Sequence, residues 1–129
     1  MNIGRAAQLS GVSAKTIRYY EEVGLIPPAA RTASGYRQYE QTDVEILRFI
    51  ERSRSLGFSV GDVAKLLSLW FDKKRQSASV KALAERHIKT IDKKVRELET
   101  MRDALRHLVK RCHGDQRPHC PIIDELADV

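Results

Sequence analysis

The clearest candidates for chemistry are two cysteines close to the C-terminal end. Cys112 and Cys120 are the only cysteines of the chain, and the polar segment HGDQRPH separates them. Thiolates are soft donors that bind Cu(I), zinc and iron–sulfur clusters. In a reducing compartment such a pair more often binds metal or senses redox state than forms a structural disulfide. We therefore predict a metal-binding loop and C-terminal tail over residues 112–129.

The small number of soft ligands favours a monovalent ion. Two thiolates without a third ligand suit Cu(I) in near-linear coordination, and Ag(I) and Au(I) are chemically similar alternatives. Zinc takes four ligands, which His113 and His119 beside the cysteines could complete. Closing a tetrahedron within so short a segment is cramped, so we favour Cu(I). A reversible disulfide between Cys112 and Cys120, acting as a redox sensor, is the other interpretation left open.

A second group of residues, in the first forty positions, has the chemistry of DNA contact. Lys15 and Arg18 share a segment of helical periodicity, where Arg18 can reach a guanine edge or a phosphate. Farther along, cationic and aromatic residues alternate as on a strand that follows a phosphate backbone. Tyr39 could instead pack beneath that strand, and Tyr19 or Tyr20 could belong to the core. The candidate DNA contacts are Lys15, Arg18, Tyr20, Arg31, Tyr36 and Arg37.

These residues need helices and a hairpin to position them. Apolar residues three or four apart predict a helix that ends at Ser10-Gly11, and Ser13 is a good cap for a second helix, which Gly24 closes. This order, over about residues 3–23, is typical of a helix-turn-helix DNA-binding unit. Pro27-Pro28 and the turn signal Ser34-Gly35 predict a hairpin, the wing, over about residues 27–39.

Two more helices complete a winged helix-turn-helix domain over residues 1–71. Thr42 with Glu45 is a capping-box pattern that opens a helix with one apolar face. Ser59 with Asp62 caps the next helix, which is apolar as far as Trp70. The chain is thus expected to be mainly α, with the wing as its strands.

A long helix is predicted over residues 77–111. Its apolar residues follow the alternating four-three step of a coiled coil, interrupted at Arg102, for about thirty residues or roughly 45 Å. Such a helix needs a partner, for which a second copy of the chain is the nearest source, and the seam leaves parallel or antiparallel pairing open. The seam residues are Ala84, Ile88, Ile91, Val95, Leu98, Leu105 and Val109.

Composition narrows the class of protein. The 129 residues carry a formal net charge of +6, which favours a polyanion such as nucleic acid or an anionic membrane surface. A signal peptide and eighteen consecutive apolar residues are both missing from the sequence, so we expect a cytoplasmic protein without a membrane partner. The sequence offers no nucleophile–base pair and no phosphate-binding loop, so we do not expect an enzyme.

Four segments together resemble a known family. They are IRYYEEVGLIPP, SGYRQY, LGFSVGDVAKLL and CHGDQRPHCPII, and they occur in the expected order along the whole chain. The chain resembles the MerR family of transcriptional regulators, and most of all its copper-sensing branch, the CueR/HmrR type. Several matches in the right order are more specific than any one of them.

The resemblance implies a mechanism and a set of partners. It implies a homodimer held by an antiparallel coiled coil, bound to a palindromic operator between promoter elements that are too far apart for RNA polymerase. Metal binding would bend and untwist this DNA and so activate metal efflux and detoxification genes. Divalent-ion sensors of the family contribute a further cysteine from the start of the dimerisation helix. The matching position here is Ser77, a serine that removes one thiolate.

Overall fold

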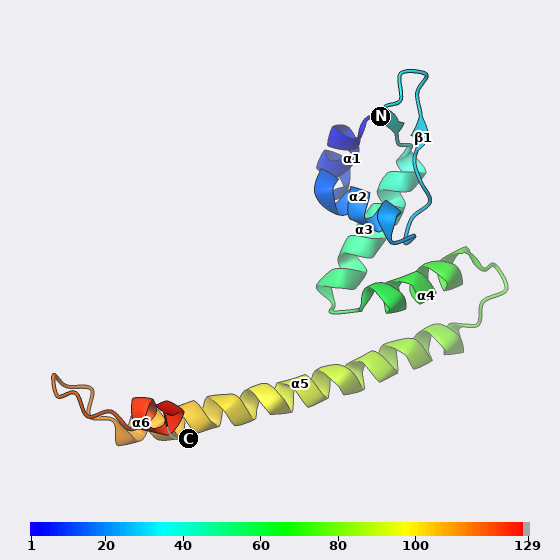
Figure 1. The fold of residues 1–129 in the computed structure, drawn as a ribbon. Helices are drawn as coiled ribbons and strands as arrows, with labels where there is room; N and C mark the ends of the chain where they lie inside the picture. Colours follow the sequence, from blue (N-terminus) through cyan, green and yellow to red (C-terminus); the bar gives the residue numbers. More distant parts are fainter. Residues whose placement is uncertain (128–129) are drawn as a thin grey trace. The chain divides into compact units, whose positions relative to one another are not determined.

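The computed structural model of the protein describes residues 1–127, and these are mainly helical, as predicted. Contacts divide the chain into one unit, Met1–Val80, and a second unit that begins at Lys81. Figure 1 shows the helices, and each unit is described here by itself. Within the described residues, no helix combines the length and apolar character that crossing a membrane requires.

The first unit opens with two short helices joined by a tight turn. They are α1 (Ile3–Ser10) and α2 (Ala14–Glu22). Gly11 ends α1 with a φ of 78°, a conformation that glycine adopts without the cost a Cβ would add. Ser13 then accepts a hydrogen bond from the Thr16 amide at 3.1 Å, which satisfies a free donor at the start of α2. The predicted turn and cap are both confirmed.

The wing is a short antiparallel hairpin. Its strands are β1 (Ala30–Arg31) and β2 (Arg37–Gln38), with Ala30 opposite Gln38 and Arg31 opposite Arg37. Directly after β2, the Tyr39 amide donates to the Met1 carbonyl at 2.7 Å. The root of the wing is therefore tied to the start of the chain, while its tip projects from the helices in Figure 1.

The helices α3 (Gln41–Ser55) and α4 (Val60–Phe71) complete this unit. The capping box of α3 consists of Glu40 and Asp43, and the Glu40 amide donates to Asp43 Oδ2 at 2.8 Å. The box predicted at Thr42 is therefore wrong, because the helix begins earlier and Thr42 already lies inside its first turn. The predicted cap of α4 is confirmed, since Ser59 accepts from the Asp62 amide at 3.1 Å.

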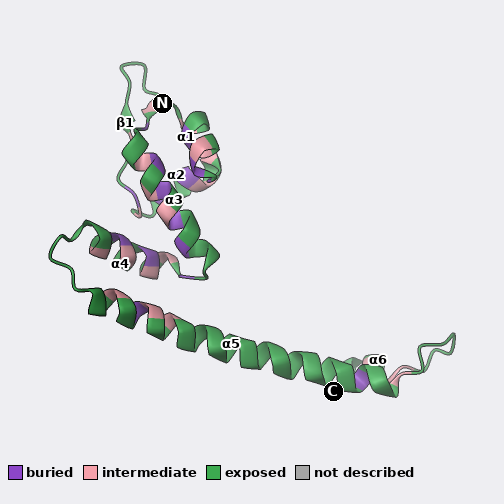
Figure 2. Cartoon of the chain, turned by 180° about the vertical axis from the view of Figure 1, so that it is seen from behind, coloured by how far each residue is buried: buried purple, intermediate pink, exposed green. Residues whose placement is uncertain are grey.

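The core of the first unit lies where its four helices and the root of the wing meet, as the buried segments of Figure 2 show. Arg48 of α3 donates twice to the Leu9 carbonyl, at 3.0 and 2.9 Å, which holds the end of α1 on α3. The side chains without any exposed surface come from α1, α2, α3 and α4. They are Ala6, Ile17, Val44, Leu47, Ile50 and Val63.

The second unit is dominated by α5 (Ser77–Arg111), whose 35 residues correspond to about 52 Å of helix. Apolar side chains that follow the predicted seam are exposed along it. They are Ile88, Ile91, Val95, Leu98, Met101, Leu105 and Val109. An apolar stripe of this length on one helix face is typical of a helix that pairs with another.

The segment expected to be a tail forms a helix, α6 (Pro121–Ala127). Pro121 occupies its first position, where the missing N–H of proline removes no helical hydrogen bond. The Asp124 amide donates to the Cys120 carbonyl at 3.0 Å and closes the first turn. Figure 1 shows α6 beside the last turns of α5, where Leu108 is buried.

Candidate metal centre and DNA-binding surface

The structure brings the two cysteines together. Cys112 directly follows α5, where its amide donates to the Val109 carbonyl at 3.1 Å, and Cys120 directly precedes α6. Their sulfur atoms lie 3.7 Å apart, and both residues are half-buried free thiols. A disulfide bond is about 2.05 Å long, so the sulfurs face each other without being bonded.

The start of α6 favours the thiolate form of Cys120. The backbone amide of Ile123 hydrogen-bonds its sulfur and lowers the pKa of Cys120, although partial burial acts in the opposite direction. The thiol of Cys112 and the amide of Ile122 lower the pKa further. Since the thiolate is the form that binds metal, α6 prepares one of the two sulfurs for coordination.

The neighbouring histidines lie apart from the sulfur pair. His119 Nδ1 lies 3.4 Å from Asp124 Oδ2, and the His119 side chain is 74% exposed. His113 is also exposed. Over residues 1–127 no three histidine, cysteine, aspartate or glutamate side chains gather closely enough to hold one metal ion. A Cys2His2 zinc site would therefore require the loop to rearrange.

Two sulfurs in this arrangement fit a two-coordinate ion after a small movement. With metal–sulfur bonds of about 2.3 Å, a linear site would place the sulfurs about 4.6 Å apart. The observed 3.7 Å is shorter than this by about 1 Å, which rotation of the half-buried side chains can supply. Cys112 and Cys120 can thus hold a soft monovalent ion without refolding of the loop between them.

The candidate DNA contacts of α2 lie on its exposed face, with one exception. Lys15 and Arg18 are exposed, whereas Tyr20 is only 5% exposed and belongs to the core. Tyr20 follows the fully buried Ile17 by three residues, so both side chains share the inner face of the helix. Its assignment as a DNA contact is therefore corrected. Tyr19, 46% exposed, occupies the outer position instead.

Three arginines surround a small hollow between α2 and the wing. The hollow measures about 160 Å³, and Arg18 of α2 and Arg31 and Arg37 of the wing line it. Tyr36 also lines it and is 73% exposed. Arg31 Nη1 donates to the Gly35 carbonyl at 2.8 Å, which holds this side chain along the turn. Arginines of α2 and of the wing thus lie close together, which suits contact with the phosphates of DNA.

Sequence analysis missed Glu21, which joins α2 to the wing. Its carboxylate accepts a hydrogen bond from Arg37 Nε at 3.1 Å and another from the Tyr39 hydroxyl. The Glu21 side chain is only 9% exposed, and burial, followed by the Glu21 hydrogen bond, raises the pKa of Tyr39. Glu21 follows the buried Ile17 by one helical turn, so helical periodicity alone could have placed it on the inner face.

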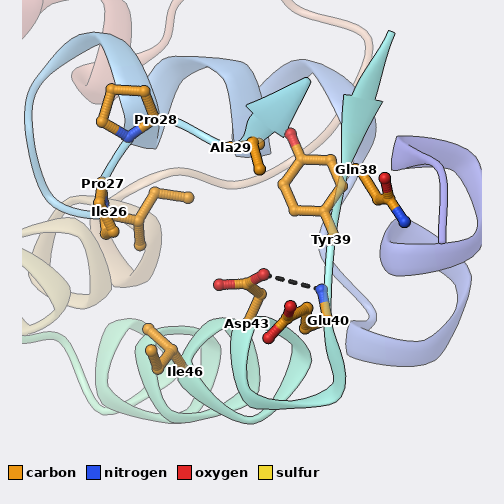
Figure 3. A pocket seen from close by; sticks show the side chains of 10 residues that line it. Ile26, Pro27, Pro28, Ala29, Gln38, Tyr39, Glu40, Asp43 and Ile46 are labelled. Carbon is orange, nitrogen blue, oxygen red and sulfur yellow. Dashed lines mark hydrogen bonds between the residues drawn. The ribbon is translucent and has the colours of Figure 1, made fainter. Parts of the chain in front are cut away.

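A larger hollow of about 230 Å³ lies at the root of the wing. Figure 3 shows Ile26, Tyr39 and Ile46 around it, with the capping hydrogen bond between Glu40 and Asp43 beside them. Its lining is mostly apolar, and the Asp43 carboxylate already closes the first turn of α3. This hollow therefore belongs to the packing of the wing against α3.

These features together define a class of protein. A helix-turn-helix with a wing and an arginine-lined hollow is suited to DNA, the exposed stripe of α5 to pairing, and the thiol pair to sensing a soft ion. Proteins that combine a DNA-binding unit with such a sensor are ligand-responsive transcriptional regulators.

Comparison with known families gives the particular group. Residues 1–70 match the MerR HTH family regulatory protein domain, and residues 44–108 match the domain described as MerR, DNA binding. The chain belongs to the MerR family of helix-turn-helix regulatory proteins. This confirms the resemblance seen in the sequence and the expectation of a DNA-binding transcriptional regulator.

Individual relatives share almost the whole chain. The HTH-type transcriptional regulator HmrR of Sinorhizobium medicae is 55% identical over 98% of this chain and 86% of its own length. Heavy metal-dependent transcription regulator 1 of Rhizobium meliloti is 54% identical over 99% of this chain and 88% of its own. The Ralstonia metallidurans regulator PbrR691, solved with lead(II), superposes with a TM-score of 0.83 at 29% identity, covering 98% of this chain and 99% of its own.

Proposed function

We propose that this protein is a dimeric, Cu(I)-responsive transcriptional activator in which Cys112 and Cys120 bind the metal. Silver(I) and gold(I), which form similar bonds with two thiolates, are the alternative ions. The expected targets are metal efflux and detoxification genes, and the expected compartment is the cytoplasm, where thiols remain reduced. That the chain responds to a heavy metal is supported by the relative named as heavy metal-dependent and by the lead(II) complex.

One observation carries the choice of ion. The two sulfurs lie 3.7 Å apart, and within residues 1–127 no third acidic, histidine or cysteine side chain joins them to form a metal-binding group. Two thiolates with one monovalent cation carry a net charge of −1 and need no further donor. A dication would be neutralised but under-coordinated, since zinc, for example, takes four ligands.

Ser77 supports the same choice from another part of the chain. It is the first residue of α5, the position at which the family resemblance expects a cysteine in divalent-ion sensors. A serine hydroxyl is a weak ligand for a soft ion, so the site keeps two thiolates only. We propose Ser77 as the position that selects a monovalent metal.

We propose that α6 connects metal binding to the DNA-binding units. Metal capture would fix Cys120 and thus the start of α6, whose apolar side chains Ile123 and Leu126 are 62% and 72% exposed. Docking of this apolar surface, together with Ile122, would favour one orientation of the DNA-binding units in the dimer. A ligand shifts an equilibrium only by its differential affinity for the two states, so the docked state must bind metal more tightly.

The output is proposed to be a change in promoter shape. The dimer would bind a palindromic operator and, when loaded, bend and untwist the DNA so that RNA polymerase can engage both promoter elements. DNA deformation of this kind costs about 1–6 kcal/mol for bends of 40–90° by elastic estimates, within reach of a soft-metal site. The residues proposed to hold the DNA are Lys15, Arg18, Arg31, Tyr36 and Arg37.

X-ray absorption spectroscopy of anaerobically loaded protein tests the metal assignment. We expect one Cu(I) per chain with two sulfur neighbours and no nitrogen. Cys112→Ser should abolish both binding and metal-dependent transcription, whereas the control His119→Ala should retain both. Four donors that include imidazole would contradict the proposal. A Cys112–Cys120 disulfide that restores transcription in metal-free protein would favour the redox sensor instead.

A further inference from the structure

We propose that Glu21 is a positioning residue for DNA binding, which locks the wing onto α2 so that Arg18 of α2 stays next to Arg31 and Arg37 of the wing. The proposal deepens the DNA-binding role on which it rests and adds a residue that does not itself touch DNA. An acidic side chain lies almost buried beside the surface that has to meet a polyanion.

The contacts of Glu21 explain why a carboxylate is kept there. One of its oxygens accepts from Arg37 Nε at 3.1 Å and the other accepts from the Tyr39 hydroxyl, so both oxygens are used. The Glu21 side chain is 9% exposed and that of Arg37 is 28% exposed. A charge-assisted hydrogen bond in a partly buried place is stronger than an exposed one, and one carboxylate here fixes two residues of the wing.

The second anchor, Tyr39, is itself held firmly. It is 2% exposed, its amide donates to the Met1 carbonyl at 2.7 Å, and its ring lines the hollow at the root of the wing in Figure 3. Glu21 therefore connects α2 with a residue that cannot move independently of the core. Arg37 lies on β2 opposite Arg31, so fixing Arg37 also fixes the strand that carries Arg31.

This connection keeps the arginines of α2 and of the wing next to one another. Arg18 comes from α2, whereas Arg31 and Arg37 come from the wing, so the three can surround one hollow only while α2 and the wing keep their relative position. A hairpin with two-residue strands has little stability of its own. Without the contacts of Glu21 the wing would sample other positions. It would then have to become ordered on binding DNA, and this cost would weaken the affinity for DNA.

Glu22 provides a matched control. It is the next residue on α2, carries the same charge and is exposed. If acidic residues merely repelled DNA, Glu21→Ala and Glu22→Ala would both tighten operator binding. If Glu21 instead holds the wing in place, the two substitutions should affect operator affinity differently. Glu22→Ala should bind as tightly as the parent protein or more tightly, and Glu21→Ala should bind about tenfold more weakly.

The experiment is a titration of a palindromic promoter fragment with the full-length protein, read by fluorescence anisotropy and by hydroxyl-radical footprinting. For Glu21→Ala we expect loss of protection where the wing lies and retained protection where α2 lies. In Arg37→Ala one of the two contacts of Glu21 is already lost, so adding Glu21→Ala should cause a smaller further loss than it does in the parent protein. Full additivity of the two changes would overturn the proposal, as would tighter binding by Glu21→Ala.

Two milder variants keep the test informative if Glu21→Ala disturbs folding. Glu21→Gln retains an acceptor for Arg37 and should recover part of the affinity. Tyr39→Phe keeps the buried ring but removes the hydroxyl donor, and it should weaken operator binding in the same direction as Glu21→Ala. Parent-like affinity in Tyr39→Phe and Glu21→Gln together would overturn the proposal. Cu(I) binding, measured on the same variants, reports separately on the metal assignment and should stay at one ion per chain.

Discussion

At the scale of single residues, the two cysteines differ in their surroundings although the sequence presents them as a simple pair. Cys112 follows a long helix and Cys120 precedes a short one. Only the fold reveals that amides at the start of α6 hydrogen-bond the Cys120 sulfur. Residue type alone was enough to propose the two cysteines as metal ligands. The lowered pKa of Cys120, however, depends on α6, a helix that sequence analysis did not predict.

The lowered pKa of Cys120 makes its reactivity depend on folding. In Cys112→Ser, the rate of alkylation by iodoacetamide should reach half its maximum at a lower pH in the folded protein than in denatured protein, where the pKa of a cysteine is about 8.5. The sign follows because a lower pKa means that the thiolate, which is the nucleophile, forms at lower pH. Identical pH profiles for folded and denatured protein would show that the α6 amides do not act on this sulfur.

Ser77 gives a second prediction at this scale. Ser77→Cys should extend the transcriptional response to Zn(II) or Pb(II), because a third thiolate supplies the ligand that a dication lacks in a two-sulfur site. The response of a reporter promoter to each metal measures the change. Ser79→Cys is the control, since it adds a thiol two residues away on another face of α5. If both variants respond alike, Ser77 has no special place in the choice of metal.

At the scale of elements, the helix ends were predictable wherever one local residue fixes them. Ser13 and Ser59 cap α2 and α4 as expected, since a serine before an apolar helix satisfies an amide that would otherwise lack a partner. The start of α3 was misplaced because it depends on the wing, which brings Glu40 to the helix in extended conformation. Tyr20 was misassigned because either of two adjacent tyrosines could face inward.

The corrected capping box can be checked by comparing two neighbouring positions. Asp43→Ala should destabilise the first unit by about 1 kcal/mol, because the Glu40 amide loses its acceptor. Thr42→Ala removes the residue that the sequence pattern selected and should change stability by much less. Thermal or urea unfolding followed by circular dichroism measures both. A larger effect at Thr42 than at Asp43 would restore the original prediction.

The exposed stripe of α5 predicts where the dimer can be broken. Leu98 is 62% exposed in the single chain, and burying such a side chain contributes about 1.5–3 kcal/mol in each copy. Leu98→Glu should therefore raise the dissociation constant of the dimer by tenfold or more, about 1.4 kcal/mol or above. Thr100→Glu introduces the same side chain on the opposite face and should leave the dimer intact. Analytical ultracentrifugation distinguishes the two, and equal weakening would place the interface elsewhere.

At the scale of the whole molecule, the net charge of +6 is modest for a DNA-binding protein. Patterning therefore matters more than the total, and the arginine-lined hollow shows how residues distant in sequence gather their charge. From the sequence, each of these arginines was predicted separately as a candidate DNA contact. The sequence did not predict that they share one hollow, because this depends on Glu21 holding two elements together.

Salt dependence tests this surface in the intact protein. Each phosphate neutralised by a cationic side chain contributes about 0.9 to the slope of log affinity against log salt concentration. Arg18→Gln and Arg31→Gln should each make this slope less steep by about 0.9. Arg106→Gln changes the net charge equally but lies on α5, so the slope should be unchanged. An equal decrease in all three variants would indicate that overall charge, and not the hollow, governs DNA binding.

The position of both thiols within one chain has a consequence for dose response. Each subunit of the dimer carries its own pair of sulfurs, so under the proposed function a dimer would hold two separate metal sites, and dimers with one filled site would form at intermediate supply. If promoter distortion needs both sites filled, output rises with the square of fractional occupancy. Transcription from the promoter would then stay low at trace levels of the metal ion and rise steeply as the ion accumulates.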